Sequence, residues 1–449
     1  MQIQLISIYK AFYFVTTIQR LKFHKYKIIQ SKTLIKLLVL LINMKFAHLA
    51  DCHIGSWRDP KLKDMSTLAF NKAIDKCIQE AVDFIIIAGD LFNTSFPRLD
   101  NLKIAVSTLK KLKDINIPVY IVPGSHDYSP SGKTMLDVLE EAGLFINVVK
   151  GEEVDGKLKL NFTLDKKTGA KITGMLGKRY SLEKGYYENL ITENLEQEPG
   201  YKIFIFHSGI DELKTEDTQN IISQPLSLLP KNFNYYAGGH VHIVKDTKIE
   251  NYGTIAYPGP LFPNSFSELE KLERGGFYIV EDNNLRWEPI QIYNTFKISK
   301  NCNGLAPEQI YDDINNEIKD KEFNNTIVLI RLKGTLSSGK PTDIDFKEIF
   351  SNLYDKSAYF VMKNTSALTT KEFEEIKIDT KSVDETETNL INEHIGQIKL
   401  KDINTSKEKL LIKNLMKALE AEKQEGETNV DFERRVKEET SKVLDVDVK

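Results

Sequence analysis

The sequence predicts an α/β protein in which buried strands alternate with the helices that cover them. Continuous apolar stretches at 44–51, 83–90 and 118–124 have strand character, and amphipathic stretches at 66–81 and 99–113 lie between them. Strand–helix–strand repetition with uninterrupted apolar strands is typical of βαβ units, whose helices pack on both faces of a sheet. The length of 449 residues indicates about two to three domains.

The same alternation continues to residue 290, and we take 44–290 as the first domain. Its later elements are a helix at 133–142, ended by Gly143, and strands near Lys171 and at 201–207, 233–240 and 253–259.

Two further parts follow this domain. Residues 291–378 again alternate helix and strand, which predicts a small appended α/β domain, whereas 379–449 is highly charged and has no strand pattern. In this tail, 408–424 places Leu411, Leu415, Met416 and Leu419 on one helical face, and 389–398 is shorter but similar. Small helices with an apolar stripe usually dock on a partner, and a self-packed helical hairpin is the alternative.

The first 43 residues differ from the rest of the chain. They contain no Asp or Glu but several Lys and Arg, and their apolar run at 37–42 is too short to span a bilayer. We expect this basic leader to lie outside the fold, with Met44 as the real start. A targeting peptide is the alternative.

Composition restricts the partners and the compartment. The formal net charge is −3, so contact with nucleic acid requires a local basic surface. The three cysteines form no CxxC pair, which argues against a disulfide framework and fits a reducing compartment.

One stretch, YIVPGSHDYSPSGKT at 120–134, has two interpretations. Its Gly132-Lys133-Thr134 ending is that of a phosphate-binding P-loop. Such a loop requires Gly five positions earlier, where this chain has Asp127, and Pro130 removes a backbone N–H from the cradle. We therefore reject nucleotide binding here and interpret Gly-Ser-His-Asp as the rim of a metal site.

Residues able to bind metal recur where the predicted strands end, and carboxyl ends of strands are where ligands bind in open α/β sheets. A Gly-Asp pair alone is usually a turn, and a lone strand-end His is usually a satisfied polar group, as we expect for His48. The recurrence in chain order instead predicts a two-metal phosphoesterase site, whose Asp and His mixture suits Mn²⁺, Fe²⁺ or Zn²⁺. Its members are Asp51, His53, Asp90, His126, Asp127, His207, His240 and His242.

The succession D-x-H, G-D, G-(N)-H-D, H and G-H-x-H resembles the calcineurin-like metallophosphoesterases. The stretches HLADCHIG, AGDLFNTSFP and GGHVH are most similar to one branch, the Mre-eleven/SbcD nuclease of DNA double-strand-break repair. The resemblance implies a four-layer sandwich of two mixed β-sheets flanked by helices, with a DNA-end-contacting capping domain at 291–378. It also implies that the helical tail at 379–449 docks on an ATPase.

The resemblance assigns roles to the strand-end residues. Asp51, His53 and His242 would hold the first metal, His207 and His240 the second, and Asp90 would bridge the two. His126 would stabilise charge at the scissile phosphate or donate a proton there, and Asp127 would orient His126. Two divalent ions, for which we expect Mn²⁺, would polarise the phosphate and generate hydroxide near neutral pH.

The chain departs from this pattern at two positions. Ser125 stands where the family has a metal-ligating Asn, and a hydroxyl is a shorter and weaker ligand. Asn93, a candidate DNA contact, stands where the nuclease branch often has a His tied to substrate handling. In the capping domain, Lys333 and Lys340 are candidate DNA contacts, or else solvated lysines interleaved with acids.

We therefore predict a metal-dependent DNA nuclease, exonuclease on duplex ends and endonuclease on single strands, that works with an SbcC/Rad-fifty type coiled-coil ABC ATPase. We expect a homodimer with no membrane association, in the cytoplasm with the nucleoid. Two alternatives stay open: a small-substrate phosphatase or phosphodiesterase, and a DNA-end scaffold whose nuclease is weakened by Ser125.

Overall fold

The computed structural model describes residues 44–370, except 130, 131 and 133, and residues 405–444, except 422, 425, 426 and 428. The basic leader at 1–43 and the helical pattern at 389–398 therefore lie outside the described residues. Within the described ranges, no helix is both long and apolar enough to cross a membrane.

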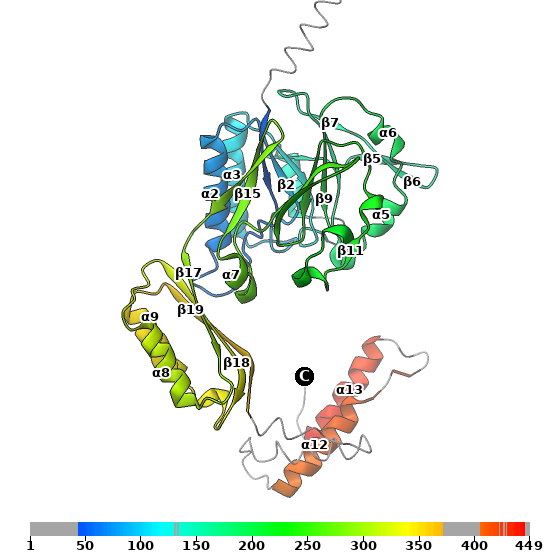
Figure 1. The fold of residues 1–449 in the computed structure, drawn as a ribbon. Coiled ribbons are helices and arrows are strands. Elements are labelled where there is room, and N and C mark those ends of the chain that lie inside the picture. Colours follow the sequence, from blue (N-terminus) through cyan, green and yellow to red (C-terminus); the bar gives the residue numbers. More distant parts are fainter. Residues whose placement is uncertain are drawn as a thin grey trace, which may run out of the picture.

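Two six-stranded mixed sheets form the first domain (Figure 1). The first sheet has the order β16 (Asn284–Ile290), β15 (Gly275–Glu281), β1 (Lys45–Leu49), β2 (Phe84–Ala88), β3 (Val119–Val122) and β4 (Ile146–Asn147). The second has the order β13 (Val244–Ile249), β14 (Gly253–Pro258), β12 (Tyr235–Gly239), β9 (Lys202–His207), β8 (Lys171–Met175) and β7 (Thr163–Leu164).

Alternate residues of the central strands face different layers. In β2, Ile85 packs in the core under helices α2 (Met65–Gln79) and α3 (Leu99–Asp114), whereas Ile86 packs in the core between the sheets. In β9, Ile205 joins the core between the sheets and Phe206 faces the opposite side. The predicted four-layer sandwich with two flanked mixed sheets is thus confirmed.

Short elements complete the domain. They are helices α4 (Met135–Glu141), α5 (Lys184–Glu188), α6 (Glu193–Glu196) and α7 (Phe266–Leu272), strands β5 (Gly151–Val154), β6 (Lys157–Leu160), β10 (Gly209–Ile210) and β11 (Ser223–Gln224), and 3-10 turns η1 (Arg179–Ser181), η2 (Asp211–Leu213), η3 (Glu216–Thr218) and η4 (Leu226–Leu228).

Two features of this domain differ from the sequence-based expectation. The antiparallel edge strands β13 and β16 were not predicted, because each has an exposed face whose polar residues interrupt the apolar pattern. Helix α4 begins at Met135, two residues later than expected, because the Asp137 carboxylate accepts a 2.7 Å hydrogen bond from the Thr134 N–H and fixes the helix start there.

The cap (residues 294–370) is a parallel sheet of β17 (Asn294–Asn301), β18 (Thr326–Leu336) and β19 (Phe360–Thr370) with helices α8 (Pro307–Ile318) and α9 (Phe346–Asp355) and the turn η5 (Pro341–Asp343). Its sheet has two different faces. Ile330 of β18 packs in the core of the cap itself, whereas Leu329 belongs to the core that includes α2 and α3 of the first domain. Tyr293 and Tyr359 stack at 3.8 Å beside that shared core. The cap is therefore seated on the first domain by apolar packing.

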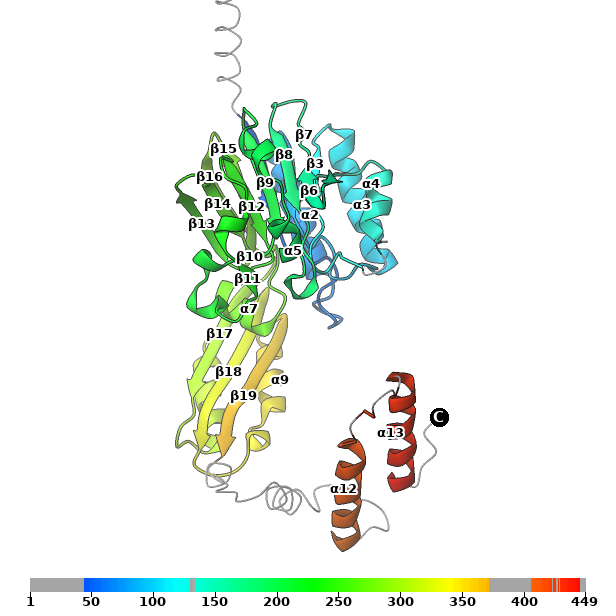
Figure 2. The ribbon, with the colours of Figure 1, turned by 90° about the vertical axis from the view of Figure 1, so that its right-hand side faces the viewer.

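The described part of the tail contains helices α12 (Thr405–Leu419) and α13 (Asn429–Leu444), which lie side by side (Figure 2). Leu410, Leu419 and Val430 are exposed on this pair. The two helices thus contact each other and still present apolar side chains at the surface.

The two faces of β18 give a testable distinction. Leu329→Ala and Ile330→Ala each remove a buried side chain, at a cost of about 2–5 kcal/mol for such truncations. In hydrogen exchange measured by mass spectrometry, we expect Leu329→Ala to raise exchange both in the cap and in the helices α2 and α3 of the first domain, which share its core. Ile330→Ala is its matched control and should raise exchange in α8 and α9 only. The same pattern from both variants would contradict a shared core.

Candidate metal centre

The strand-end residues predicted from the sequence come together where the two sheets meet. β1 runs parallel to β2 and β9 parallel to β12, so their carboxyl ends lie at one edge of the domain. Asp51 and His53 follow β1, Asp90 follows β2, His207 ends β9, and His240 and His242 follow β12.

Four of these residues have an unusual backbone. Asp51, His53, Asp90 and His240 adopt φ angles of 48°, 42°, 53° and 83°. Non-glycine residues in such conformations cost of order 1–3 kcal/mol each and cluster at functional sites, where the surrounding structure holds them. The chain thus gives up stability to aim these side chains at one point.

Glycines allow the approach. A Cβ atom on Gly89, at φ +84°, would lie 2.1 Å from Nδ1 of His207, and a Cβ on Gly124 would lie 2.2 Å from Oδ1 of Asp90. Both distances are far below van der Waals contact. The glycines before Asp90 and Ser125 are therefore required for the site to close.

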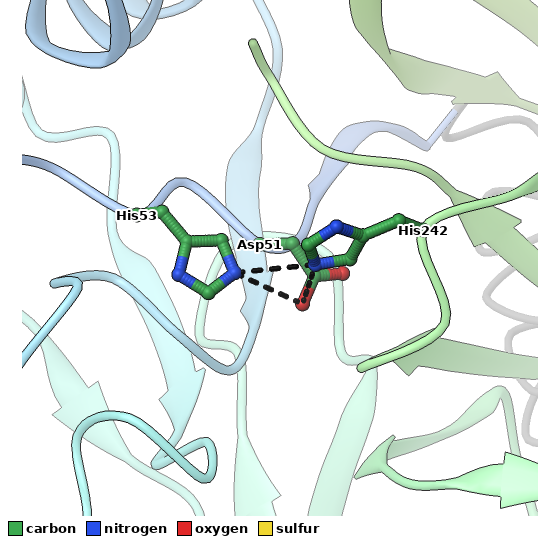
Figure 3. Close-up of side chains that lie close together, drawn as sticks. All are labelled: Asp51, His53 and His242. Carbon is green, nitrogen blue, oxygen red and sulfur yellow. Dashed lines mark hydrogen bonds and ion pairs between the residues drawn. The ribbon is translucent and has the colours of Figure 1, made fainter. Parts of the chain in front are cut away.

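Asp51, His53 and His242 form one half of the cluster (Figure 3). The two Nε2 atoms of His53 and His242 are 3.2 Å apart, and Asp51 Oδ1 lies 3.6 Å from His242 Nε2 and 3.9 Å from His53 Nε2. The Nδ1 of His242 is 3.0 Å from Oε1 of Glu268. Because a carboxylate only accepts, Nδ1 carries the proton and the neutral ring has its lone pair on Nε2, toward Asp51 and His53.

Asp90 and His207 form the other half. Asp90 Oδ2 lies 3.2 Å from His207 Nε2 and 3.7 Å from His53 Nε2, so this carboxylate stands between the two halves. His207 Nδ1 donates to the Ala88 carbonyl at 2.8 Å, which again leaves Nε2 to face the cluster. That buried Nε2 pairs with Asp90 Oδ2 as an ion pair and makes no well-aligned hydrogen bond among the described residues.

This arrangement fits divalent metal ions. Imidazole nitrogens, which offer lone pairs once deprotonated, converge with carboxylate oxygens, and this is the donor set typical of Mn²⁺, Fe²⁺ or Zn²⁺ sites. Three overlapping groups have ligand atoms within 4.8 Å of one another, namely Asp51–His53–His242, His53–Asp90–His126 and Asp51–Asp90–His207.

Pairing between histidines and carboxylates shifts the histidine pKa values in the absence of metal. Burial disfavours a charged His207, but the adjacent Asp90 carboxylate raises the pKa of His207 to about 9. Burial is likewise outweighed at His242, whose pKa Asp51 and Glu268 raise well above the usual value. By contrast, burial lowers the pKa of His53 and His240 to about 4. Two imidazolium rings thus neutralise the two buried carboxylates when no metal is present.

His126 and Asp127 differ from the expectation in how they are held. The His126 ring is fixed by a 2.8 Å hydrogen bond from Nδ1 to the Asn93 carbonyl, and Asp127 has no bond to it. Asp127 instead accepts the backbone N–H groups of Leu91, Phe92 and Gly124 at 3.0–3.1 Å. Asp127 therefore ties together the loops after β2 and β3, and Asn93 orients His126 through its backbone.

The remaining predicted residues are placed less directly. Ser125 Oγ is 3.4 Å from Asp90 Oδ2. His240 donates its backbone N–H to both oxygens of Asp51, and its ring lies 5.1 Å from that of His207, outside the three ligand groups. Lys333 and Lys340 are exposed in the cap, and no described contact joins them to the cluster. His48 is buried and bonded to the Tyr235 hydroxyl at 2.9 Å, as a structural residue.

Glu268 is the residue that sequence reasoning missed. It stands three positions after Ser265, whose Oγ accepts the Glu268 N–H and caps α7. The S-x-x-E spacing signals a helix start, which was available in the sequence. Its contact with His242 was not, because the two residues lie on different elements.

Comparison with known proteins agrees with this geometry. The family model for calcineurin-like phosphoesterases matches residues 44–244. A DNA double-strand break repair protein Mre11 from Archaeoglobus fulgidus is 31% identical over 51% of this chain and 53% of its own length. The Mre11 protein from Methanocaldococcus jannaschii is 30% identical over 70% of this chain and 80% of its own.

The alignments span about half the length of the Archaeoglobus fulgidus and Methanopyrus kandleri relatives, 53% and 54%. A solved structure of a dimetal phosphatase from Danio rerio covers 55% of this chain and 98% of its own, at 10% identity and a TM-score of 0.34.

Metal binding is expected to release protons. His207, with a pKa of about 9, is protonated at neutral pH in the metal-free protein and must lose its Nε2 proton to become a ligand. The affinity for a divalent ion, measured with Mn²⁺ as the probe, should therefore rise as the pH is raised from neutral through about pH 9. Calorimetric titrations in two buffers of different ionisation enthalpy measure the released protons. Equal heats in both buffers would contradict the expectation.

Proposed function

Because the chain belongs to the Mre11 family of DNA double-strand break repair proteins, we propose that it is a metal-dependent nuclease acting on broken DNA. The observation that carries the proposal is the buried convergence of Asp51 and Asp90 with the Nε2 atoms of His53, His207 and His242. Its substrates would be duplex ends, cut as an exonuclease, and single strands, cut as an endonuclease.

We assign the ligands in two sets. Asp51, His53 and His242 would hold the first ion, His207 and His240 the second with Ser125 beside them, and Asp90 would bridge both. The position of Asp90 between the halves supports its bridging role, since its Oδ2 approaches imidazoles of each. We propose Mn²⁺ for both sites, because mixed imidazole and carboxylate donors suit it. When bound, such ions polarise a phosphodiester and lower the pKa of a coordinated water.

His126 would act on the substrate itself. Its backbone N–H donates to Asp90 Oδ1 at 2.7 Å, and its ring lies 4.7 Å from the His53 ring. The residue is partly buried, so its ring can be reached from solvent. Because Nδ1–H is engaged by Asn93, Nε2 is free to contact an oxygen of the scissile phosphate and to stabilise the leaving group.

The other parts of the chain would serve DNA and a partner. The cap, with Lys333 and Lys340, would steer duplex ends toward the metals. The tail would dock on an SbcC/Rad-fifty type ABC ATPase, for which the exposed Leu410, Leu419 and Val430 of α12 and α13 are the apolar contacts. We place the protein with the nucleoid in the cytoplasm, as a homodimer.

A second candidate function rests on Ser125. Its hydroxyl is 3.4 Å from Asp90 Oδ2, so it contacts the proposed bridging ligand. An Asn at this position would instead offer an amide oxygen to a metal. A poorly held second ion would leave a DNA-end-binding scaffold with weak nuclease activity. No specific observation favours the other alternative, a small-substrate phosphodiesterase.

The nuclease is tested with the chain from Met44 onward and end-labelled linear duplex DNA, with Mn²⁺ or with chelator. We expect Mn²⁺-dependent cutting that Asp90→Ala and His126→Ala reduce at least about 100-fold, since each removes a proposed ligand or a group that acts in the transition state. His48→Gln, a buried change outside the cluster, is the control. Cutting that persists in chelator or in Asp90→Ala would refute the proposal.

Ser125→Asn separates the enzyme from the scaffold. An amide oxygen at this position would ligate the second ion, so we expect a tighter second Mn²⁺ and faster cutting, with end binding unchanged. The readouts are calorimetric stoichiometry and the rate of product formation under single turnover. A rise of more than about tenfold favours the scaffold interpretation for the native chain, whereas an unchanged rate means that Ser125 is sufficient.

A further inference from the structure

Glu268 lies against a proposed metal ligand and also begins a helix. One carboxylate oxygen, Oε1, is 3.0 Å from Nδ1 of His242, and the other, Oε2, accepts the Asn264 N–H at 2.8 Å. The side chain is 27% exposed, so both interactions are partly shielded from solvent. Glu268 therefore fixes the His242 ring relative to the start of α7.

Helix α7 is too short to hold itself. Isolated helices need roughly 12–15 residues to be stable in water, and α7 has 7. Its start is fixed by Ser265, whose side chain accepts the Glu268 N–H, and Leu269 packs in the main core. The position of Glu268 thus depends on what packs around the helix.

The cap holds the opposite side of the same helix. Glu270 is two residues beyond Glu268, so it points about 200° around the helix axis. Its carboxylate oxygens accept from Nε of Arg331 on β18 at 2.7 and 2.8 Å, and the Arg331 guanidinium lies 5.0 Å from the Phe266 ring centroid. Figure 1 shows α7 at the junction of the first domain and the cap.

Strand β17 of the cap adds further contacts. Lys297 Nζ lies 2.6 Å from Glu273 Oε1, just beyond the helix, and donates to the Glu270 carbonyl at 3.3 Å. Thr295 donates its hydroxyl to the Glu273 carbonyl at 2.9 Å. α7 is thus held by His242 through Glu268 on one side and by two cap strands on the other.

We propose that Glu268 is a positioning residue for His242, and that its position depends on the packing of the cap against α7 through the contact between Glu270 and Arg331. The inference deepens the proposed function, on which it rests for the identity of His242 as a ligand. Residues that orient a metal-ligating His through its second nitrogen change metal affinity by about 10–100-fold when removed. A cap displaced from its seat would move α7 and weaken the first metal position.

Metal affinity is measured with Mn²⁺ alone, by electron paramagnetic resonance of the free ion, on the full chain. We expect Glu268→Ala to bind about 10–100-fold more weakly and Arg331→Ala several-fold more weakly. In the double variant the losses should not add, because both changes release the same ring. The control is Arg286→Ala, which breaks the ion pair with Glu80, a residue that also pairs with Lys45 at the amino end of β1.

A second readout needs no metal. With ¹⁵N-histidine labelling, the Nδ1 proton of His242 should be visible and protected from exchange in the metal-free protein. It should be lost in Glu268→Ala and exchange faster in Arg331→Ala. An unchanged proton in Glu268→Ala would overturn the positioning role, and wild-type behaviour of Arg331→Ala in both readouts would overturn the coupling. If the wild type binds no Mn²⁺ at all, the proposed function fails, while this proton still tests the contact.

Discussion

Two carboxylates, Asp51 and Asp90, are buried side by side where the sheets meet, with 0% and 2% of their surfaces exposed. Burying ionised groups is costly unless opposite charge and hydrogen bonds surround them. Histidines and backbone N–H groups supply both here: His207 and His242 face the carboxylates, and the His126 and His240 amides donate to them. The left-handed backbones and the close glycines are the means of bringing these partners within reach. The two sheets of the first domain hold the segments that carry these partners around Asp51 and Asp90.

The core of the first domain extends into the cap. Because Leu329 of β18 belongs to the same core as α2 and α3, the cap is not attached by a linker alone. The polar contacts of Arg331 and Lys297 with α7 lie next to that apolar seat, and α7 leads to His242 through Glu268. The contact between the cap and the first domain is therefore connected to the candidate metal centre through packed residues of this chain, along one short helix.

Much of this could be predicted from the sequence, and the exceptions have a common cause. The parallel strands and their terminal Asp and His residues are local patterns, so they could be recognised one by one and then placed together by the rule that strand ends share an edge. The contact of Glu268 with His242 and the Asn93 carbonyl that holds His126 could not. Each depends on a contact between distant segments or on a backbone atom, which residue identity does not encode. Asp127 shows the same limit, because the role that the resemblance implies for it depends on a contact with His126, and its carboxylate instead binds backbone N–H groups.

The two halves of the site are also held unequally, and this bears on the departure at Ser125. His242 is oriented by a carboxylate, which raises the basicity of a ligating imidazole, whereas His207 is oriented by the neutral carbonyl of Ala88. Asp51 accepts two hydrogen bonds from one backbone amide, at 3.0 and 3.1 Å, and this fixes both of its oxygens. Asp90 accepts one short backbone bond at Oδ1, and its Oδ2 faces His207 and Ser125. A weaker donor at position 125 therefore falls on the half whose histidine is oriented by a neutral carbonyl, which is where an added amide oxygen would strengthen ion binding most.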